Sequence, residues 1–353
     1  DTIRKMGNKN AARQLMIAHH IPVVPGSVGL VDSSEQAMRI ADEIGYPVLL
    51  KASAGGGGKG MRKAFSKEEI QQAFDTARAE AKAAFGNDDL YMEKLILNPH
   101  HIEFQILADK FGNRIQLGER DCSLQRRNQK LLEESPSRFL SAKLRKEMGM
   151  VAVVAADAAE YLGAGTIEFV VDEEGNYFFI EMNTRIQVEH PVTEEVTGID
   201  LIKEQLRIAS GQKLSLKQEE VVVRGHAMEC RILAEDSNNQ FMPSPGTVSF
   251  LHLPSGYGVR VDSDLYTGCV TSPYYDSMIA KIIVHGETRL EAIRRMRRAL
   301  EELFIEGIKT NTDFMHLLLH HPVFLKGNYD TSFWEKYANE IMDWECNRGK
   351  EEK

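Results

Sequence analysis

The sequence GTIEFVV at residues 165–171 and the sequence YFFIEMN at residues 177–183 decide the fold class of this chain. Both are rich in β-branched and aromatic residues, which is typical of β-strands. The segment DEEGN between them predicts a hairpin that turns at Glu174-Gly175. In that hairpin Glu168 stands directly opposite Glu181 on one face. We therefore expect these two strands to belong to an antiparallel sheet.

The facing pair of carboxylates predicts a metal site. Carboxylates directly opposite each other on a ladder repel unless a cation joins them. A solvated acidic pair on an outer face is the ordinary alternative. The two strands are otherwise almost wholly apolar, however, which indicates that both faces are buried, and buried carboxylates need a cation. Since the ligands are oxygen atoms, Mg²⁺ or Mn²⁺ is the expected ion at Glu168 and Glu181.

Polar residues continue beyond the second strand at every other position. An extended segment would place all of them on one side: they are Glu181, Asn183, Arg185, Gln187 and Glu189. The Arg185 guanidinium can fork onto a small anion, and Glu189 could act as a general base. An ordinary amphipathic edge strand is the alternative. His190 ends the run and is expected to be a structural hydrogen-bonding residue.

A glycine-rich segment, AGGGGKGM at residues 54–61, predicts a phosphate-covering flap. Adjacent glycines allow backbone N–H groups to converge on a phosphate. A Rossmann loop would open directly into a helix, whereas residues 61–65 resemble a strand, and no Ser or Thr follows Gly-Lys as in a Walker A loop. A hairpin tip without a ligand is the alternative. Lys51, at the end of the preceding strand, favours the flap.

The remaining pattern predicts an α+β protein. Sequences of the S/T-x-x-E/Q type at Ser33, Ser66 and Thr288 predict helix starts. Strands and helices are mixed without regular βαβ alternation, which favours antiparallel sheets. Residues 21–93 could form a separate small lobe, the charged segment 119–130 resembles a solvated loop, and Arg231 resembles a paired sheet arginine. The expected helices are 8–19, 34–44, 67–84, 141–162, 200–210, 289–305, 311–320 and 332–344, and the further expected strands are 46–52, 102–108, 114–118, 221–234, 248–252 and 278–285.

Composition narrows the class of protein. A chain of 353 residues favours two domains, and 42% hydrophobic with 27% charged residues excludes disordered and collagen-like chains. The net charge of −9 argues against a nucleic-acid partner, and no apolar run is long enough to span a membrane. Four scattered cysteines indicate a reducing, cytoplasmic setting. The first residues lack a signal peptide and an initiator Met, so we expect a cut chain.

Together these residues resemble the biotin carboxylase family of ATP-grasp enzymes. The resemblance runs from Met6 to about Tyr337, with near-verbatim segments such as KASAGGGGKGM, GERDCSLQRRNQKLLEESPS, FIEMNTRIQVEHPVTE and PYYDSMIAK. It implies an α+β ATP-grasp fold with a small glycine-loop lid and a larger C-terminal antiparallel-sheet domain. The implied bounds are a linker helix at 1–20, the lid at 21–95, the C-terminal domain at 96–340 and a tail at 341–353.

The resemblance also implies an activity. ATP and bicarbonate would form carboxyphosphate, which carboxylates protein-linked biotin, the first half-reaction of acetyl-CoA carboxylase in fatty acid synthesis. The implied cofactors are ATP, Mg²⁺ (or Mn²⁺) and carrier-linked biotin. The implied partners are a biotin carboxyl carrier protein, carboxyltransferase subunits and, for the full-length form, a second copy in a homodimer. The alternatives are another ATP-grasp ligase and a folded nucleotide-binding fragment without turnover.

Site residues follow from the same resemblance, position by position. Glu189 would deprotonate bicarbonate and Arg231 would stabilise the biotin enolate. The residues implied to bind ATP are Lys9, Lys51, Gly56, Gly57, Gly58, Met61, Glu93, Leu95 through its backbone, Ile96 and His101. Those implied to hold the metal are Glu168, Glu181 and Asn183, and those implied to hold bicarbonate are Lys130, Arg185, Gln187 and Val188. The implied catalytic set is Glu189, Arg231, Arg185 and Lys130.

The family's N-terminal Rossmann-like domain has no counterpart in this sequence. In the family that domain shares in the biotin pocket and in the dimer surface. We therefore expect a chain that binds Mg·ATP but carboxylates free biotin poorly.

Overall fold

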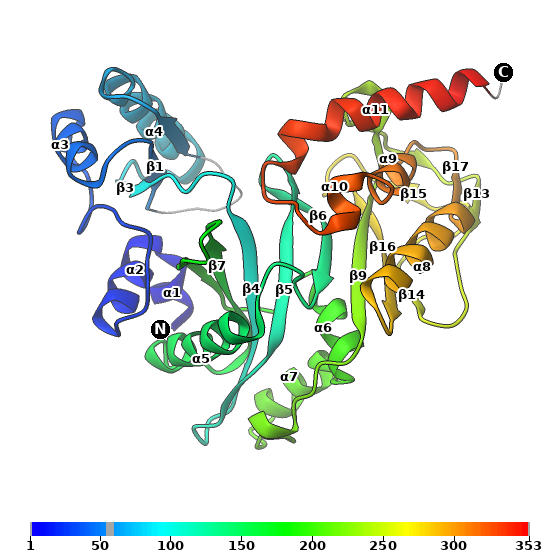
Figure 1. Cartoon of the computed structure of the whole chain (residues 1–353), viewed down its shortest axis with the longest axis horizontal. Coiled ribbons are helices and arrows are strands. Elements are labelled where there is room, and N and C mark those ends of the chain that lie inside the picture. The colour runs from blue at the N-terminus through cyan, green and yellow to red at the C-terminus, as the bar shows by residue number, and fades with distance from the viewer. Residues whose placement is uncertain (1, 54–59, 352–353) are drawn as a thin grey trace.

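A computed structural model, which describes residues 2–53 and 60–351, is centred on a fully antiparallel eight-stranded sheet (Figure 1). The strand order is β14-β16-β9-β6-β5-β4-β7-β8. In chain order the strands are β4 (His100–Ala108), β5 (Arg114–Arg126), β6 (Gln129–Ser135), β7 (Gly163–Val171), β8 (Tyr177–Asn183), β9 (His226–Leu233), β14 (Val259–Ser263) and β16 (Met278–Gly286). The predicted α+β class with antiparallel sheets is confirmed.

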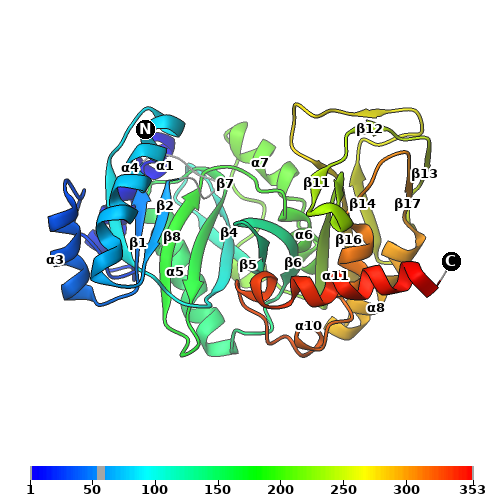
Figure 2. The ribbon, with the colours of Figure 1, turned by 90° about the horizontal axis from the view of Figure 1, so that it is seen from above.

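A small lobe has a sheet and an apolar core of its own. Its sheet has the order β2-β1-β3, and side chains such as Leu50, Phe74 and Met92 are buried together in it. The lobe contains α3 (Ser34–Ile44), β1 (Val48–Ala52), β2 (Met61–Ala64), the 3₁₀ turn η1 (Lys67–Glu69), α4 (Ile70–Phe85) and β3 (Leu90–Lys94). Figure 2 shows this lobe and the region around β13 and β17 at opposite ends of the molecule.

Helices cover the central sheet in two groups. Phe104 and Phe169 are buried with Met16 of α2 and Met148 of α5, so the first helices belong to the core on the β4–β8 side. On the β9–β16 side, α8, α9 and α11 enclose a second core. The helices are α1 (Thr2–Gly7), α2 (Lys9–Ala18), α5 (Ala142–Ala158), α6 (His190–Thr197), α7 (Leu201–Ala209), α8 (Arg289–Glu302), α9 (Thr312–Leu318), α10 (Pro322–Lys326) and α11 (Phe333–Glu351), with 3₁₀ turns η2 (Gln218–Glu220) and η3 (Ser237–Asn239).

Short strand pairs complete the fold beyond the sheet. They are β10 (Glu235–Asp236) with β11 (Met242–Pro243), β12 (Gly246–Thr247) with β15 (Val270–Thr271), and β13 (Phe250–His252) with β17 (Phe304–Glu306). In the part of the chain that the structure describes, no helix has the length and apolar character needed to cross a membrane.

The predicted hairpin is confirmed at the pair of glutamates, and it differs from the prediction at its turn. Glu168 pairs with Glu181 on β7 and β8, as expected. The register then shifts by one, so that Phe169 pairs with Phe179. Because the Asp172 N–H donates to the Asn176 carbonyl (2.9 Å), the turn is a three-residue loop with Gly175 at φ +86°, rather than a tight turn at Glu174-Gly175. A bulge of this kind absorbs the extra residue without disturbing the acidic pair.

Two of the three predicted helix caps are confirmed. The Ser33 hydroxyl accepts from the Gln36 N–H (3.2 Å) and the Thr288 hydroxyl accepts from the Glu291 N–H (3.3 Å). The cap predicted at Ser66 is wrong, since its side chain makes no capping bond and a 3₁₀ turn precedes α4. The sequence S/T-x-x-E/Q therefore located the helix starts without guaranteeing the hydrogen bond.

Four further expectations are corrected by the strand boundaries. Helix α8 ends at Glu302, because residues 304–306 pair with β13 as β17 instead of extending the helix. Residues 221–225 and 248–249 lie outside strands. The segment 119–130 is not a solvated loop: it forms most of β5 and the start of β6, joined by a turn at Arg127-Asn128 where both φ angles are positive.

A buried carboxylate on β6 makes ionic and hydrogen-bond contacts with α8, with β9 and with Tyr329. The Glu134 carboxylate, which is fully buried, accepts from Arg289 Nε (2.7 Å) on α8 and lies 2.6 Å from His226 Nε2 on β9. It also accepts from the Tyr329 hydroxyl. Burial alone would raise the pKa of Glu134, but Arg289 and His226 lower it to about 2.

We expect Glu134→Gln to lower the free energy of unfolding by about 1.5–3 kcal/mol at neutral pH, the range for hydrogen bonds to charged groups. Because the folded pKa is depressed from 4.5, the ionic contribution is present above the unfolded pKa and is lost as pH falls toward about 2. Urea unfolding between neutral and acid pH should therefore show the wild type and the variant converging. A constant gap across that range would contradict the assignment.

Candidate active site

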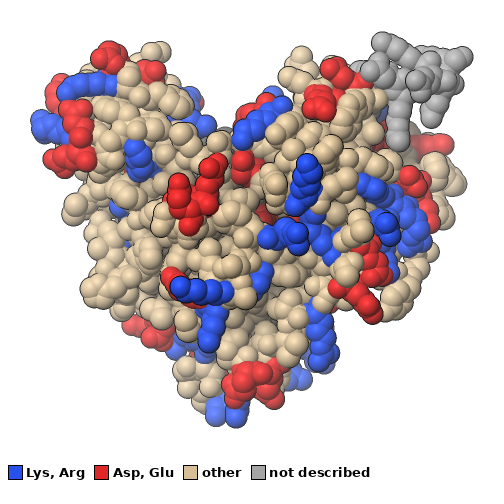
Figure 3. All heavy atoms as spheres, viewed as in Figure 1, with Lys and Arg blue, Asp and Glu red and all other residues tan. Residues whose placement is uncertain are grey.

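A row of charged side chains crosses one face of the central sheet. Its members are brought together by strand register: Glu181 pairs with Glu168, Glu168 with Glu103, and Glu103 with Arg120. Farther along, Glu133 pairs with Glu229, and Arg231 pairs with Lys281. In Figure 3 the surface is notched between the small lobe and the C-terminal half of the chain, with acidic and basic side chains on the walls of the notch.

Lys130 joins three carboxylates of this row. Its Nζ lies 2.6 Å from Glu103 Oε2, 3.2 Å from Glu168 Oε1 and 2.6 Å from Glu189 Oε1. Burial alone would lower the pKa of Lys130, but the surrounding anionic groups raise it well above its usual value. The side chain is therefore a fixed ammonium ion at the centre of the row.

Glu189 is held between two cations. One carboxylate oxygen accepts from Lys130, and the other accepts from Arg231 Nη2 at 3.0 Å. Burial would raise the pKa of Glu189, but Lys130 and Arg231 lower it to about 2. Arg231 also donates from Nε to Glu133 Oε1 (2.7 Å), which confirms its interpretation as a paired sheet arginine. Glu189 is therefore an ionised carboxylate at neutral pH, able to accept a proton.

Arg120 is a wholly buried arginine whose guanidinium hydrogen-bonds side chains of this row. It donates from Nε to Glu103 (2.5 Å) and from Nη2 to Gln187 Oε1 (3.1 Å). Its remaining bonds go to Gln105, Thr166 and Thr193. Because Gln187 in turn donates to Glu168 Oε1 at 2.8 Å, Arg120 fixes residues that face the site.

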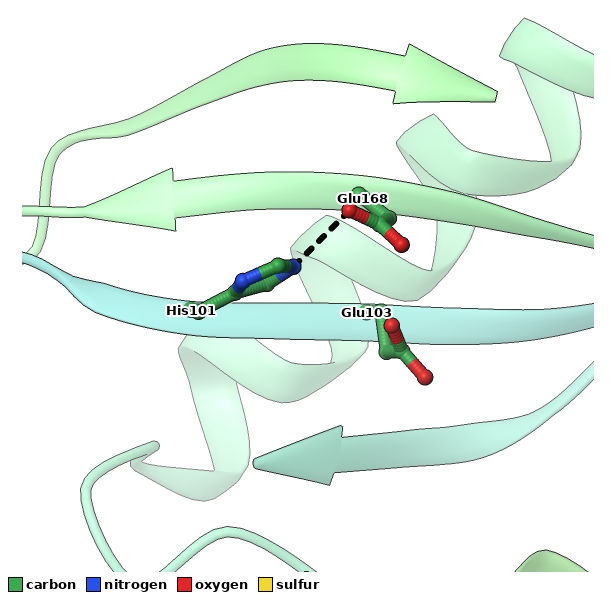
Figure 4. A group of neighbouring side chains, drawn as sticks. All are labelled: His101, Glu103 and Glu168. Atoms are coloured by element: carbon green, nitrogen blue, oxygen red, sulfur yellow. Dashed lines mark hydrogen bonds and ion pairs between the residues drawn. The ribbon is translucent and has the colours of Figure 1, made fainter. Parts of the chain in front are cut away.

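Glu168 is the most heavily coordinated acid of the metal set predicted above. It accepts from Asn183 Nδ2 (2.9 Å) as well as from Lys130 and Gln187, and His101 Nε2 lies 2.9 Å from its Oε2. Figure 4 shows His101 on β4 pointing toward Glu168 on the neighbouring strand, with Glu103 beside them. Burial would raise the pKa of Glu168, but Lys130 and His101 hold it well below its usual value.

The extended run predicted from Glu181 to Glu189 is only partly present. Strand β8 ends at Asn183, the chain bends, and helix α6 begins at His190. Glu181, Asn183, Gln187 and Glu189 still converge on the row through the bonds given above and, for Glu181, through Lys9. Arg185 does not: its side chain is exposed and donates to the neighbouring Ile186 carbonyl (3.1 Å). His190 hydrogen-bonds the Gln187 carbonyl (2.8 Å), as expected for a structural residue.

The two lysines predicted to bind phosphate contact different parts of the fold, one the central sheet and the other the small lobe. Lys9 Nζ lies 2.8 Å from Glu181 Oε2. In the small lobe Lys51 pairs with the buried Glu93, which Arg13 also approaches at 3.5 Å. Met61 starts β2 and is partly buried. Gly56, Gly57 and Gly58 lie outside the residues that the structure describes.

The linker after β3 restricts the backbone contact predicted for Leu95 to its carbonyl group. Its backbone N–H already donates to the Pro47 carbonyl at 2.9 Å, so it is not free for a ligand. Among residues 2–53 and 60–351, the N–H of Ile96 has no hydrogen-bond acceptor. Val188 shows a related division: its carbonyl accepts from Lys281 Nζ (2.9 Å), while its N–H has no acceptor among the same residues.

Comparison with known proteins identifies the family. Residues 8–217 match the model for the carbamoyl-phosphate synthase L chain ATP-binding domain, and residues 229–336 match that for the biotin carboxylase C-terminal domain. Biotin carboxylase 1 of Bacillus subtilis is 56% identical over 96% of this chain and 75% of its own length. The chain belongs to the biotin carboxylase family.

Other biotin carboxylase relatives agree in sequence and fold. Chloroplastic biotin carboxylase 2 of Populus trichocarpa is 54% identical over 97% of this chain and 65% of its own length. A crystal structure of the biotin carboxylase domain of Hydrogenobacter thermophilus 2-oxoglutarate carboxylase, in complex with MgADP, ADP and bicarbonate, superposes with a TM-score of 0.93 at 48% identity. It covers 96% of this chain and 75% of that one. The chain thus spans about two thirds to three quarters of the length of these relatives.

Four buried charged residues of the site were not predicted from the sequence: Glu103, Arg120, Glu133 and Glu229. A signal for the first exists, since IEFQI at residues 102–106 alternates polar and apolar residues. Glu133 is harder to predict, because strict alternation along a strand would place it on the other face of the sheet from Lys130. A register shift between Leu124 and Gln125 in the β5–β6 pairing changes that alternation. Lys130 therefore bonds Glu189 directly, and Glu133 bonds Arg231, which also bonds Glu189.

Proposed function

We propose that this chain catalyses the ATP-dependent carboxylation of biotin by bicarbonate. The observation that carries the proposal is the Glu189 carboxylate held between Lys130 and Arg231, next to the acids that we propose as metal ligands. Two fixed cations can hold a small oxyanion, and the carboxylate between them can take its proton. Family membership supports the same reaction.

The nucleotide would lie between the small lobe and the row of charges. Lys9 and Lys51 would contact its phosphates, and Met61, Glu93, the Leu95 backbone and Ile96 would line the adenosine side. Because the Leu95 N–H is already used, the N–H of Ile96 is the group available to the base. His101 contacts Glu168, which favours a role near the metal acids over one near adenosine. We propose residues 21–95 as the lid and residues 96–340 as the C-terminal domain.

The donor set near β7 and β8 fits Mg²⁺. Glu168, Glu181 and Asn183 offer oxygen atoms, which hard divalent cations prefer. The nearby group of His101, Glu103 and Glu168 could also surround an ion, but Lys130 already places its ammonium between Glu103 and Glu168. When bound, the ion would neutralise charge on the transferred phosphoryl group. On binding the ion, Glu181 would give up its contact with Lys9, and Glu168 would give up its contact with His101.

The remaining residues would act on bicarbonate and biotin. Lys130, Gln187 and the Val188 N–H would hold bicarbonate. Arg185, which donates to the Ile186 carbonyl in this structure, would join them by changing its side-chain conformation. As the anion draws Lys130 and Arg231 toward itself, the lowering of the Glu189 pKa would relax, making the carboxylate a better base. Glu189 would take the proton as the bicarbonate oxygen attacks the γ-phosphorus and ADP leaves. When carboxyphosphate separates into CO₂ and phosphate, the phosphate would take the ureido proton of biotin, and Arg231 would stabilise the resulting enolate as it attacks CO₂.

The setting of the reaction is part of the proposal. A biotin carboxyl carrier protein would deliver biotin, carboxyltransferase subunits would use the product, and a homodimer in a cytoplasmic complex is expected for the full-length form. Acetyl-CoA carboxylase and fatty acid synthesis remain our first assignment. The 2-oxoglutarate carboxylase relative makes a keto acid the second candidate for the final carboxyl acceptor.

The test is bicarbonate-dependent ADP formation by the chain, with and without free biotin. Formation that needs bicarbonate and rises with biotin supports the proposal. Binding of Mg·ATP without any turnover favours the alternative, a nucleotide-binding fragment. Stimulation by an amine but not by biotin would identify another ATP-grasp ligase. A chain that binds no Mg·ATP would overturn all three.

We expect Glu181→Gln to weaken Mg·ATP binding at least tenfold while leaving Mg-free ATP binding nearly unchanged, because it removes one anionic oxygen from the proposed metal set. Calorimetry with and without Mg²⁺ measures both. Glu174→Gln in the hairpin loop is the matched control and should change neither. Equal Mg·ATP affinity in wild type and Glu181→Gln would refute the metal assignment.

A further inference from the structure

Glu229 is a buried acid that the proposed mechanism does not use. It lies in the middle of β9 and is 0% exposed. Neither of its carboxylate oxygens accepts a hydrogen bond from any described residue. An ionised carboxylate without a partner is strongly unfavourable in such surroundings, so Glu229 must be neutral or must share a proton.

Glu133, which faces Glu229, also has a carboxylate oxygen without a hydrogen-bond donor in the described part of the chain. It stands directly opposite Glu229 on β6 and is also 0% exposed. Glu133 Oε1 accepts from Arg231, whereas Oε2 has no donor among the described residues. Opposed side chains on an antiparallel ladder have Cβ atoms about 5 Å apart, which brings the two carboxyl groups within reach. Two carboxylates can only accept hydrogen bonds; a single proton turns one into a donor to the other.

The cations around the pair are already committed. Arg231 divides its donors between Glu133 and Glu189. Lys281, on β16, donates to the Val188 carbonyl (2.9 Å) and lies 3.4 Å from Asp262. From α6, which packs on β9, His190 bonds the Gln187 carbonyl and lies 3.9 Å from Glu194. None of these side chains donates a hydrogen bond to Glu229 within the described residues.

The electrostatic environment agrees with this geometry. Burial, and next the charge of Glu133, raise the pKa of Glu229 well above its usual value. Burial also raises the pKa of Glu133, against the opposing effect of Arg231.

We propose that Glu133 and Glu229 share one proton, donated by Glu229 to Glu133 Oε2, and that Glu229 is thereby a positioning residue for Arg231. The shared proton limits the anionic neighbours of Arg231 to two, Glu133 and Glu189, and fixes the Glu133 carboxylate against the Arg231 Nε. Ionisation of both acids would put a third negative charge beside the place proposed for bicarbonate. The catalytic consequence rests on the proposed function, whereas the shared proton does not.

Infrared difference spectroscopy tests the proton directly. At neutral pH the wild type should show the C=O stretch of a protonated carboxylic acid that shifts in D₂O, and Glu229→Gln should lose it. Glu219→Gln, which alters an exposed acid on η2, is the control and should keep the band. An unchanged band in Glu229→Gln would overturn the proposal. If that variant does not fold, wild type labelled with ¹³C-glutamate decides: absence of a glutamic-acid C=O band at neutral pH is equally contradictory.

The positioning role has a separate kinetic readout. Above the pH at which the pair loses its proton, the KM for bicarbonate of the wild type should rise about tenfold per pH unit, as one coupled proton requires. In Glu229→Gln this rise should disappear, since the amide cannot ionise. The same rise in both proteins would refute the positioning role. A chain without turnover would count against the proposed function, and the infrared result would still decide the shared proton.

Discussion

Replacing Glu189 with Gln should slow bicarbonate-dependent ADP formation by about 10²–10⁴-fold, the range for loss of a positioned general base. The amide keeps the size of the side chain, but its single oxygen can accept from only one of Lys130 and Arg231, which hold the two carboxylate oxygens of Glu189 at 2.6 and 3.0 Å. It cannot accept the bicarbonate proton. Affinity for Mg·ATP should stay within a few-fold of the wild type, because the nucleotide-binding residues proposed above lie on other elements.

The pH dependence offers a second check on the same residue. Glu189 has a pKa of about 2 in the resting site, so its ionisation should impose no acidic limb between pH 5 and 8. An acidic limb in that range that disappears in Glu189→Gln would show that anion binding raises the pKa much further than we propose. Glu195→Gln, in α6, is the control, because Glu195 lies near Arg260 and makes no ion pair with Lys130. Near-normal turnover of Glu189→Gln would contradict the assignment of the base.

Whether an interaction could be predicted from the sequence depended on how far apart its residues lie along the chain. The pairing of Glu168 with Glu181 needs only one hairpin and alternation of side chains, so it was predictable, and the bulge near the turn left it intact. The caps at Ser33 and Thr288 are local in the same sense. These local interactions were therefore placed correctly, whereas the cap at Ser66, which is equally local, was not, because a 3₁₀ turn precedes α4.

The rest of the site depends on which strands become neighbours. Glu133 meets Glu229 only because β6 lies next to β9 in the sheet, across 96 positions of sequence. Arg120 looked like part of a solvated loop because neighbouring charges are usually exposed; it is buried because five partners from three other segments satisfy it. Such long-range satisfaction leaves no periodic pattern in the sequence.

Arg120→Met should lower the free energy of unfolding by about 3–5 kcal/mol, as is typical when one partner of a buried ion pair is removed. Arg120 is 0% exposed, and its Nε pairs with the equally buried Glu103. Methionine fills much of the space but donates to nothing, which leaves Glu103 with Lys130 alone and leaves Gln105 and Gln187 each without one donor. Arg120→Lys should recover only part of the loss, because an ammonium cannot reproduce the planar fork.

The double variant Arg120→Met/Glu103→Gln separates the stranded charge from the lost packing. If the loss of one of the two cations beside the Glu103 carboxylate dominates, the double variant should be more stable than Arg120→Met at neutral pH. Burial raises the pKa of Glu103 even beside its cations, and removing Arg120 raises it further. Stability gained through a raised folded pKa is complete below the unfolded pKa and is lost as pH rises through the folded one. The deficit of Arg120→Met relative to the double variant should therefore shrink as pH falls in urea unfolding. A deficit below about 1 kcal/mol in Arg120→Met, at the level of a surface ion pair, would show that the buried network does not depend on this guanidinium.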